Sequence, residues 1–168
     1  MSEAKIGEKS IDWMKQLTGH LSAVECASDG KKVPLAAAFD AFAALYADIR
    51  SRGKAVWWVG NGGSSGICSH LSQDTLNKLL VRSFVLTDPA LSTCMANDYG
   101  YENVYARPLD ILSNEGDLLI AISSSGKSKN ILSAVQVAAK KKMKVVTLSG
   151  FEPNNPLRST ASHLSFYV

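Results

Sequence analysis

Two short glycine- and serine-rich segments contain the residues most able to bind an anion. In the first, residues 60–66 read GNGGSSG, so glycine occupies four of seven positions. Glycine allows backbone N–H groups to turn toward a ligand without a Cβ in the way, and a helix that begins here adds free amides and a positive dipole end. This segment predicts contact with a phosphate or another anionic or polyhydroxyl group; the alternative is a tight strand-to-helix turn without a ligand.

The second segment is richer in hydroxyl groups, since residues 123–128 read SSSGKS. Four hydroxyls and the amides of a following helix can hold a phosphate through hydrogen bonds, without a fixed cation. A helix N-cap is the alternative, although one serine is enough for a cap. Neither segment fits a nucleotide motif, because GxGxxG would need glycine at Ser65 and GxxxxGKS/T would need glycine at Ala121.

A histidine and a carboxylate follow the first segment, at His70 and Asp74. Residues four apart lie on one face of a helix, so these two could supply two ligands to a divalent metal such as zinc. Asp74 could instead move a proton as a general base. A hydrogen-bonded pair without further function is the third possibility. We expect His163 to be a satisfied surface histidine rather than a third member of this group.

The segments that must position these residues alternate between strand and helix. Five short apolar runs predict buried strands, at 55–59, 84–87, 118–122, 145–148 and 164–168. Helical segments lie between them, at 67–80, 89–97, 104–112 and 129–142. The alternation predicts an α/β fold: a three-layer, doubly wound, parallel five-stranded sheet with helices on both faces. Ligands of such sheets bind beyond the carboxyl ends of the strands, which is where both segments fall.

Two helices are expected before the first strand, over residues 11–26 and 34–50, with a turn at Asp29 and Gly30 between them. The second is apolar around more than one face, so we expect a second subunit to cover part of it. We expect a single domain over 1–168, in which residues 1–50 form N-terminal helices for oligomerisation and residues 51–168 form the ligand-binding core.

The composition excludes several classes of protein. The formal charge is only +3, and the lysines at 140, 141, 142 and 144 suit the end of a helix, so we expect no nucleic-acid partner. Three widely spaced cysteines, at 26, 68 and 94, predict a reducing compartment rather than a disulfide framework. The polar first ten residues do not resemble a signal peptide, and no apolar run suits a membrane span. We therefore expect a cytoplasmic protein without a membrane partner.

Taken in order, these motifs resemble the sugar isomerase (SIS) domain family, and within it the phosphoheptose isomerases. The resemblance spans nearly the whole chain and lies in GNGGS at 60–64, His70, NDYG at 97–100 and SSSGKS at 123–128. It implies a flavodoxin-like order of the strands. It also implies these contacts with a sugar phosphate: Asn61, Gly62, Gly63 and Ser64 with the sugar, Ser123, Ser124, Ser125 and Ser128 with the phosphate, and Asn97 and Asp98 along the same pocket.

The same resemblance implies an activity and a metal. His70 would bind zinc. Asp74 stands where the family has a glutamate, one methylene longer, that serves as metal ligand and catalytic base. Asp74 would take these two roles and would also contact the substrate. The implied reaction is the aldose–ketose isomerisation of sedoheptulose 7-phosphate to D-glycero-D-manno-heptose 7-phosphate, for lipopolysaccharide or capsule heptose. The implied assembly is a homotetramer.

Two departures from the family pattern favour an alternative. The family carries a glutamine and a histidine of the site on a helix beyond the last strand, and the sequence printed here ends at Val168, so neither role is assigned. Asp74 is also shorter than the glutamate of the family. The alternative is a non-catalytic SIS module that binds a sugar phosphate for regulation or for docking of a partner.

Overall fold

The centre of the fold is a run of parallel strands that are covered on both faces. The computed structural model describes residues 3–168. Its central strands are buried at every position, which explains why their sequences are apolar without alternation. The five parallel strands are β3 (Ala55–Gly60), β4 (Arg82–Val85), β5 (Leu118–Ser123), β6 (Lys144–Ser149) and β7 (Leu164–Tyr167).

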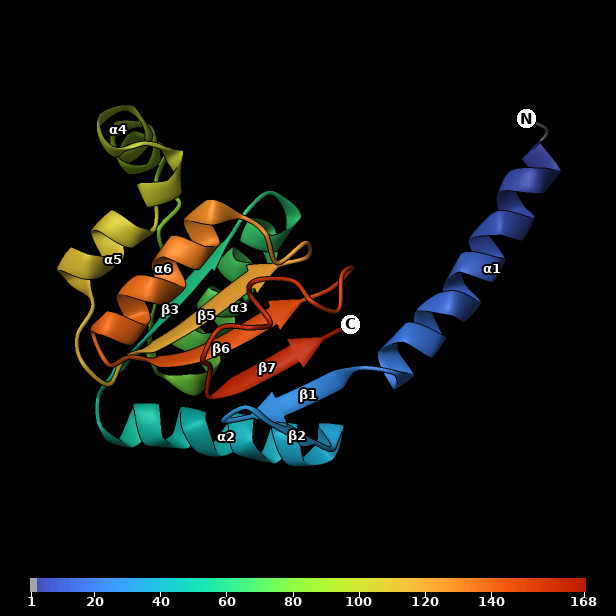
Figure 1. Cartoon of the computed structure of the whole chain (residues 1–168), viewed down its shortest axis with the longest axis horizontal. Helices are drawn as coiled ribbons and strands as arrows, with labels where there is room; N and C mark the ends of the chain where they lie inside the picture. Colours follow the sequence, from blue (N-terminus) through green and yellow to red (C-terminus); the bar gives the residue numbers. More distant parts are fainter. Residues whose placement is uncertain (1–2) are drawn as a thin grey trace.

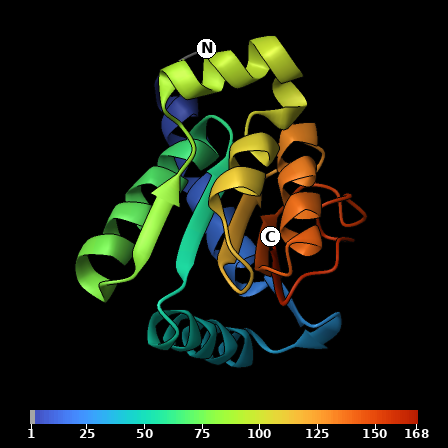
Figure 2. The same ribbon diagram turned by 90° about the vertical axis from the view of Figure 1, so that its left-hand side faces the viewer.

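Helices cover both faces of this sheet, as the alternating pattern predicts. One core lies between the strands and α2 (Leu35–Ser51) and α3 (Gly63–Leu79). The other lies beneath α5 (Ala106–Leu112) and α6 (Lys129–Lys140). Figure 2 shows α3 and α6 on opposite sides of the strands. The three-layer α/β class is therefore confirmed.

A further helix and a single 3-10 turn lie between β4 and α5. They are α4 (Pro89–Tyr99) and η1 (Tyr101–Asn103). Asp88 caps α4 by accepting a hydrogen bond from the amide of Leu91 at 2.8 Å, and Pro89 occupies the first helical position. This local signal explains why the helix starts where the sequence predicts.

The strand order places a switch point between β3 and β5. The full order is β2-β1-β7-β6-β5-β3-β4, and the five strands from β7 to β4 are parallel. From β3 the chain moves outward to β4 and then returns to β5. It continues the other way from β5 to β6 and β7 (Figure 1). Adjacent strands whose connections leave in opposite directions open a crevice at their carboxyl ends, as in flavodoxin-like folds.

The N-terminal region differs from the expected pair of helices. Residues 25–33 form a hairpin of β1 (Glu25–Ser28) and β2 (Lys31–Val33), so the helix predicted to reach Cys26 ends at Ser22. The sheet thus has seven strands rather than five, and β1 pairs with β7 in antiparallel fashion. Asp29 and Gly30 both have positive φ, the conformation of a tight hairpin turn. The open edge of β7 supplies hydrogen bonds that outweigh the helical periodicity of the preceding residues.

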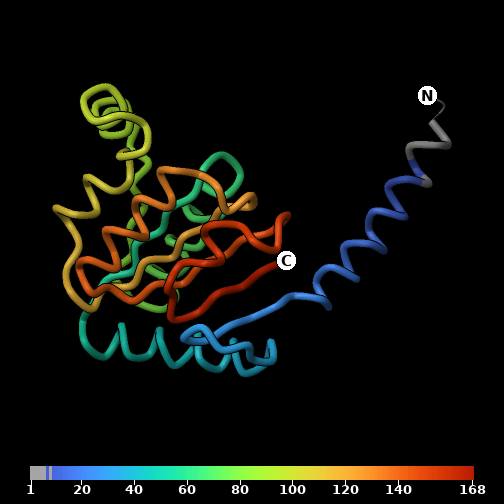
Figure 3. The backbone as a smooth tube through the Cα atoms, in the orientation of Figure 1, coloured from blue at the N-terminus to red at the C-terminus, as the bar shows by residue number. Residues whose placement is uncertain are grey.

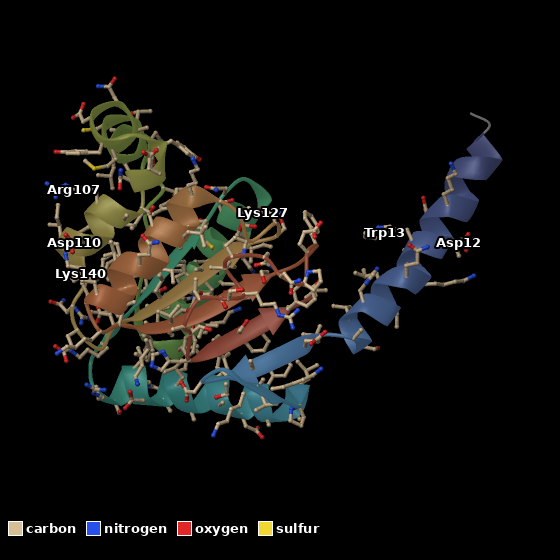
Figure 4. The ribbon with its side chains drawn as sticks, viewed as in Figure 1. Asp12, Trp13, Arg107, Asp110, Lys127 and Lys140 are labelled. Carbon is tan, nitrogen blue, oxygen red and sulfur yellow. The ribbon has the colours of Figure 1, made fainter. Side chains whose placement is uncertain are left out.

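The first helix, α1 (Glu3–Ser22), extends away from the α/β body (Figure 3). Its apolar side chains are left exposed: Ile11 at 56%, Met14 at 62%, Leu17 at 40% and Leu21 at 56%. These positions follow helical spacing and form one stripe, hereafter the α1 stripe. Trp13 is also exposed, at 62%, and lies on the side of α1 nearer the body (Figure 4). Within residues 3–168, no helix has both the length and the apolar character that a membrane span requires.

Candidate functional site

The two glycine- and serine-rich loops leave the same edge of the sheet from neighbouring strands. β3 and β5 pair in parallel with Gly60 opposite Ile122, so the loops that follow them start side by side. Each loop leads directly into a helix, α3 or α6. The N-cap residues, Gly62 and Ser128, make no side-chain capping bond, and in α6 the amide of Ile131 donates to Asn130 Oδ1 at 3.0 Å. Two helix starts therefore flank the switch point, and their positive dipole ends favour an anionic ligand.

The first loop is held by a cluster of amides and phenols around Asn61. The side-chain amides of Asn61 and Asn130 exchange two hydrogen bonds, at 3.0 and 2.8 Å. The phenol of Tyr105 donates to the carbonyl of Gly60 at 2.6 Å and lies 3.4 Å from Asn61 Oδ1. Burial raises the pKa of Tyr105 to about 12, so its phenol stays protonated and remains a donor at neutral pH. The amide oxygen of Asn61 is thus turned toward the protein.

The serines of the second loop differ in their environments. The hydroxyl of buried Ser123 donates to Ser128 Oγ at 3.2 Å, across the mouth of the loop. Ser125 Oγ accepts from the amide of Lys127 at 3.2 Å, while Ser124 is exposed. Figure 4 shows Lys127 beside this loop and Lys140 near the opposite end of α6. The loop therefore combines hydroxyl groups, helix amides and one nearby cation.

A third segment supports the second loop from behind. Asn155 is completely buried, and its amide nitrogen donates to Ser149 Oγ at 3.1 Å and to the carbonyl of Glu152 at 2.9 Å. The amide of Leu157 donates to the carbonyl of Gly126 at 3.0 Å. The sequence does not reveal Asn155, because no local pattern indicates that the loop between β6 and β7 packs against the loop at 123–128.

Asn97 and Asp98 lie on the exposed surface of α4. Asn97 Nδ2 donates to Asp98 Oδ1 at 2.8 Å, and the thiol of Cys94 donates to the same carboxylate at 3.5 Å. That hydrogen bond raises the pKa of Cys94. The segment reaches the first loop through Tyr101 instead, whose phenol lies 3.4 Å from Asn61 Oδ1. Tyr101 was not among the residues predicted for the site.

His70 and Asp74 share one face of α3, as their spacing predicts. His70 Nε2 lies 3.7 Å from Asp74 Oδ2, and the ammonium of Lys78 lies 3.0 Å from Asp74 Oδ1. The His70 side chain is 70% exposed, and that of Asp74 is 27% exposed. Asp74 also lines an apolar groove of about 1010 Å³ between α2 and α3. The pair is therefore accessible, and one carboxylate oxygen is already engaged.

His163 lies apart from this pair, at the start of β7. Its Nδ1 accepts a hydrogen bond from the amide of Val145 at 3.1 Å, so the ring is satisfied but half-buried rather than on the surface. Burial lowers the pKa of His163, and the nearby Lys144 lowers it further. Among residues 3–168, no group of three or more His, Cys, Asp or Glu side chains comes together around a possible metal ion.

These features define a doubly wound α/β protein in which two helix starts lie side by side at the switch point. The model of the SIS domain family matches residues 22–150 of the chain. That range covers most of the sequence and includes both loops. The chain therefore belongs to the SIS domain family.

Within the family, the chain is similar to phosphoheptose isomerases. The phosphoheptose isomerase of Cytophaga hutchinsonii is 44% identical over 96 residues, which are 54% of this chain and 50% of that protein. The one from Thiobacillus denitrificans is 33% identical over 141 residues, 80% of this chain and 72% of that protein. The chain thus aligns with about half the length of the first of these relatives.

A solved structure extends the similarity to the fold. The structure of a phosphoheptose isomerase from Francisella tularensis superposes with a TM-score of 0.79 at 29% identity, covering 96% of this chain and 82% of that one. The phosphoheptose isomerase of Neisseria gonorrhoeae gives a TM-score of 0.69 at 26% identity. The fold of this chain is therefore similar to that of these two proteins over most of their length.

Proposed function

We propose that the chain is an aldose–ketose isomerase that converts sedoheptulose 7-phosphate to D-glycero-D-manno-heptose 7-phosphate. The observation that carries the proposal is the pair of helix starts, α3 and α6, whose N-cap side chains make no capping bond and whose loops leave neighbouring strands at the switch point. A phosphate would bind at the serine loop, and the sugar would extend along the glycine loop. The similarity to phosphoheptose isomerases supports this choice of substrate.

The residues given roles in substrate binding follow from this placement. Gly62, Gly63 and Ser64 would present amides and a hydroxyl from the first turn of α3, and Asn61 would contribute its remaining amide hydrogen. The serines at 123, 124, 125 and 128 would surround the phosphate. Asn97 and Asp98 would reach the sugar from α4 if that helix closes toward the loops.

The chemistry needs a base near the carbon next to the carbonyl. Asp74 would remove a proton from C1 of the ketose while O2 gains a proton, giving an enediol; the base would then return the proton to C2 as O1 loses one. The phosphate is not consumed, and its binding energy holds the reactive end in place. The second acid–base group is not assigned to a residue of this chain.

Zinc binding at His70 and Asp74 is also proposed, but these two side chains alone do not complete a zinc site. Catalytic zinc sites use three protein ligands, whereas this face of α3 offers two, and Lys78 already engages one carboxylate oxygen. A third ligand would have to come from outside the described cluster or from another subunit. No step above depends on the metal. Elemental analysis of purified protein, with a His70→Ala variant as the control, measures whether zinc is bound.

A homotetramer is proposed from the uncovered apolar surfaces. The α1 stripe is exposed, and the groove between α2 and α3 is lined mainly by apolar side chains, including Phe39, Leu79 and Leu148. Burying such surfaces against further copies would stabilise the assembly. Light scattering at micromolar concentration should give the mass of a tetramer, and Met14→Glu should lower it, while Gln16→Glu should not. A monomeric wild-type protein would contradict the proposal.

The cellular setting is proposed on chemical grounds. The three cysteines at 26, 68 and 94 are free thiols. Free thiols and a phosphorylated sugar substrate suit the reducing cytoplasm. The product would then serve the heptose of lipopolysaccharide or capsule.

Hydrogen exchange in heavy water tests the isomerase directly. The full-length gene product is incubated with sedoheptulose 7-phosphate in D2O, and deuterium at C1 and C2 is followed by NMR. Enzymatic proton transfer predicts incorporation that depends on protein concentration. A non-catalytic SIS module is the second candidate, favoured by the pairing of Asp74 with Lys78 at 3.0 Å. Measurable binding without any deuterium at either carbon would select that candidate.

A further inference from the structure

Asn130 occupies the first turn of α6 and connects the two loops of the candidate site. It is 2% exposed, and its side chain reaches across the switch point to Asn61, 69 positions earlier in the sequence. Asn130 Nδ2 donates to Asn61 Oδ1 at 2.8 Å, and Asn61 Nδ2 donates to Asn130 Oδ1 at 3.0 Å. The pair is thus a two-bond link between the glycine loop and the helix that follows the serine loop.

The backbone decides which way round this pair is oriented. The amide of Ile131 donates to Asn130 Oδ1 at 3.0 Å, so this position must be the oxygen of Asn130. The oxygen of Asn130 then requires a donor from Asn61, which fixes the nitrogen of Asn61 toward Asn130. The oxygen of Asn61 accepts from Asn130 and faces the phenols of Tyr105 and Tyr101 at 3.4 Å each.

Counting donors shows what Asn61 can still offer to a ligand. Its amide nitrogen has two hydrogens, and one is used by Asn130. Its amide oxygen accepts from Asn130 and faces two phenols. Asn61 is therefore left with a single N–H donor, which suits a ligand oxygen that accepts, such as a carbonyl, hydroxyl or phosphate oxygen.

We infer that Asn130 is a positioning residue: it locks the Asn61 amide so that one N–H is left to donate to a ligand, and it holds the two loops at a fixed separation. This inference rests on the proposed function for its kinetic consequences but not for the orientation of the amide. Removing Asn130 leaves Asn61 free to rotate and to present its oxygen. Ligand oxygens would then meet an acceptor instead of a donor.

The orientation is tested by NMR, independently of any activity. In ¹⁵N-labelled protein, the side-chain amide signals of Asn61 are assigned by their loss in Asn61→Ala. We expect Asn130→Ala to move these signals and to speed their exchange with water by about tenfold, as for the loss of one internal hydrogen bond. Gln136→Ala, an exposed change on the same helix, is the control. Unchanged Asn61 signals in Asn130→Ala would overturn the inference.

A second variant covers the case in which Asn130→Ala does not fold. Asn130→Asp keeps the shape of the side chain and can accept from Ile131 and Asn61, but it cannot donate to Asn61 Oδ1. We expect the Asn61 signals to shift in this variant too, in protein whose melting curve stays cooperative. Asn61 signals identical to those of the wild type would show that the donor from Asn130 does not orient this amide.

Kinetics separate positioning from general support of the fold. We expect Asn130→Ala to lower kcat/KM roughly tenfold to a hundredfold, as small misplacements of binding groups do. In an Asn61→Ala background the same change should cost less than about twofold, because its target is already gone. Losses that multiply would overturn the inference. If the wild type shows no turnover while the Asn61 signals still respond to Asn130→Ala, the isomerase proposal fails and the positioning role stands.

Discussion

Gly126 lies directly against the side chain of Asn155, with no room for a Cβ between them. A methyl group placed on Gly126 would overlap the Asn155 side chain. Gly126 also has φ of +62°, in the left-handed region that favours glycine. Because Asn155 is completely buried and hydrogen-bonded to Ser149 and Glu152, it cannot move aside cheaply. The serine loop thus depends on a packing contact with the loop before β7.

The first prediction is that Gly126→Ala disrupts the serine loop. The change should lower the affinity for inorganic phosphate and for sedoheptulose 7-phosphate by at least about tenfold, measured by calorimetry, and should lower the melting temperature. Gly53→Ala is a matched control, because Gly53 has φ of +61° and open space around its Cβ position. It should incur the same backbone strain, about 1 kcal/mol, and leave the affinity unchanged. Equal losses of affinity in both variants would contradict the prediction.

The second prediction concerns the hydroxyl of Ser128, which accepts from Ser123 at 3.2 Å at the start of α6. Ser128→Ala should weaken binding of the sugar phosphate roughly tenfold, the effect of one hydrogen bond to a charged group. Ser133→Ala, on the same helix but beyond its first turn, should have no effect on the dissociation constant. Calorimetric titrations of both variants make the comparison. A normal affinity in Ser128→Ala would remove this serine from the phosphate site.

The third prediction tests Asp74 as the base. Asp74→Asn should reduce deuterium incorporation from D2O by about a hundredfold or more, because an amide cannot accept the proton. The affinity for the substrate and the melting temperature should change little, since the ion pair with Lys78 is partly exposed and worth under about 1 kcal/mol. Asp74→Glu should retain measurable exchange. If Asp74→Asn exchanges as fast as the wild type, the base lies elsewhere.

The fourth prediction follows from the lowered pKa of His163. Burial and Lys144 hold its pKa below the value of about 6.5 that it regains on unfolding, while Asp29 opposes them weakly. The unfolded chain therefore binds more protons than the folded one just below pH 6.5, so the free energy of unfolding falls as pH decreases through this range. Urea unfolding between pH 5 and 7.5 measures the slope.

A variant isolates the contribution of His163 from those of other groups. Asparagine can accept the hydrogen bond from Val145 without titrating, so His163→Asn should show a shallower pH dependence between pH 5 and 6.5 than the wild type. Parallel curves for the two proteins would mean that His163 titrates alike in the folded and unfolded states.

The fold could be read from the sequence where the signal was local. The runs at 55–59 and 118–122 are apolar without alternation, and both became buried parallel strands. The hairpin at 25–33 was missed because its stability comes from pairing with β7, more than 130 residues later, as Glu25 opposite Tyr167 shows. Asp29-Gly30 is the local signal that indicates the hairpin, because this dipeptide is typical of two-residue hairpin turns.

The candidate site was predicted in part for the same reason. The two loops have compositions that differ from ordinary turns, so residues 60–66 and 123–128 stood out. Asn130, Tyr105 and Asn155 did not, since each acts through contacts with segments distant in the sequence. The one local signal for Asn130 is its position, in the first turn of the helix that follows the serine loop.

Mapping the ligand on the protein tests the central claim most directly. In ¹⁵N-labelled protein titrated with sedoheptulose 7-phosphate, the account predicts the largest amide shifts in residues 61–64 and 124–130, on both sides of the switch point. A cavity at the other end of the sheet, near Lys144 and His163, provides an internal comparison. Shifts centred on that cavity, or confined to only one of the two loops, would contradict a phosphosugar crevice between β3 and β5.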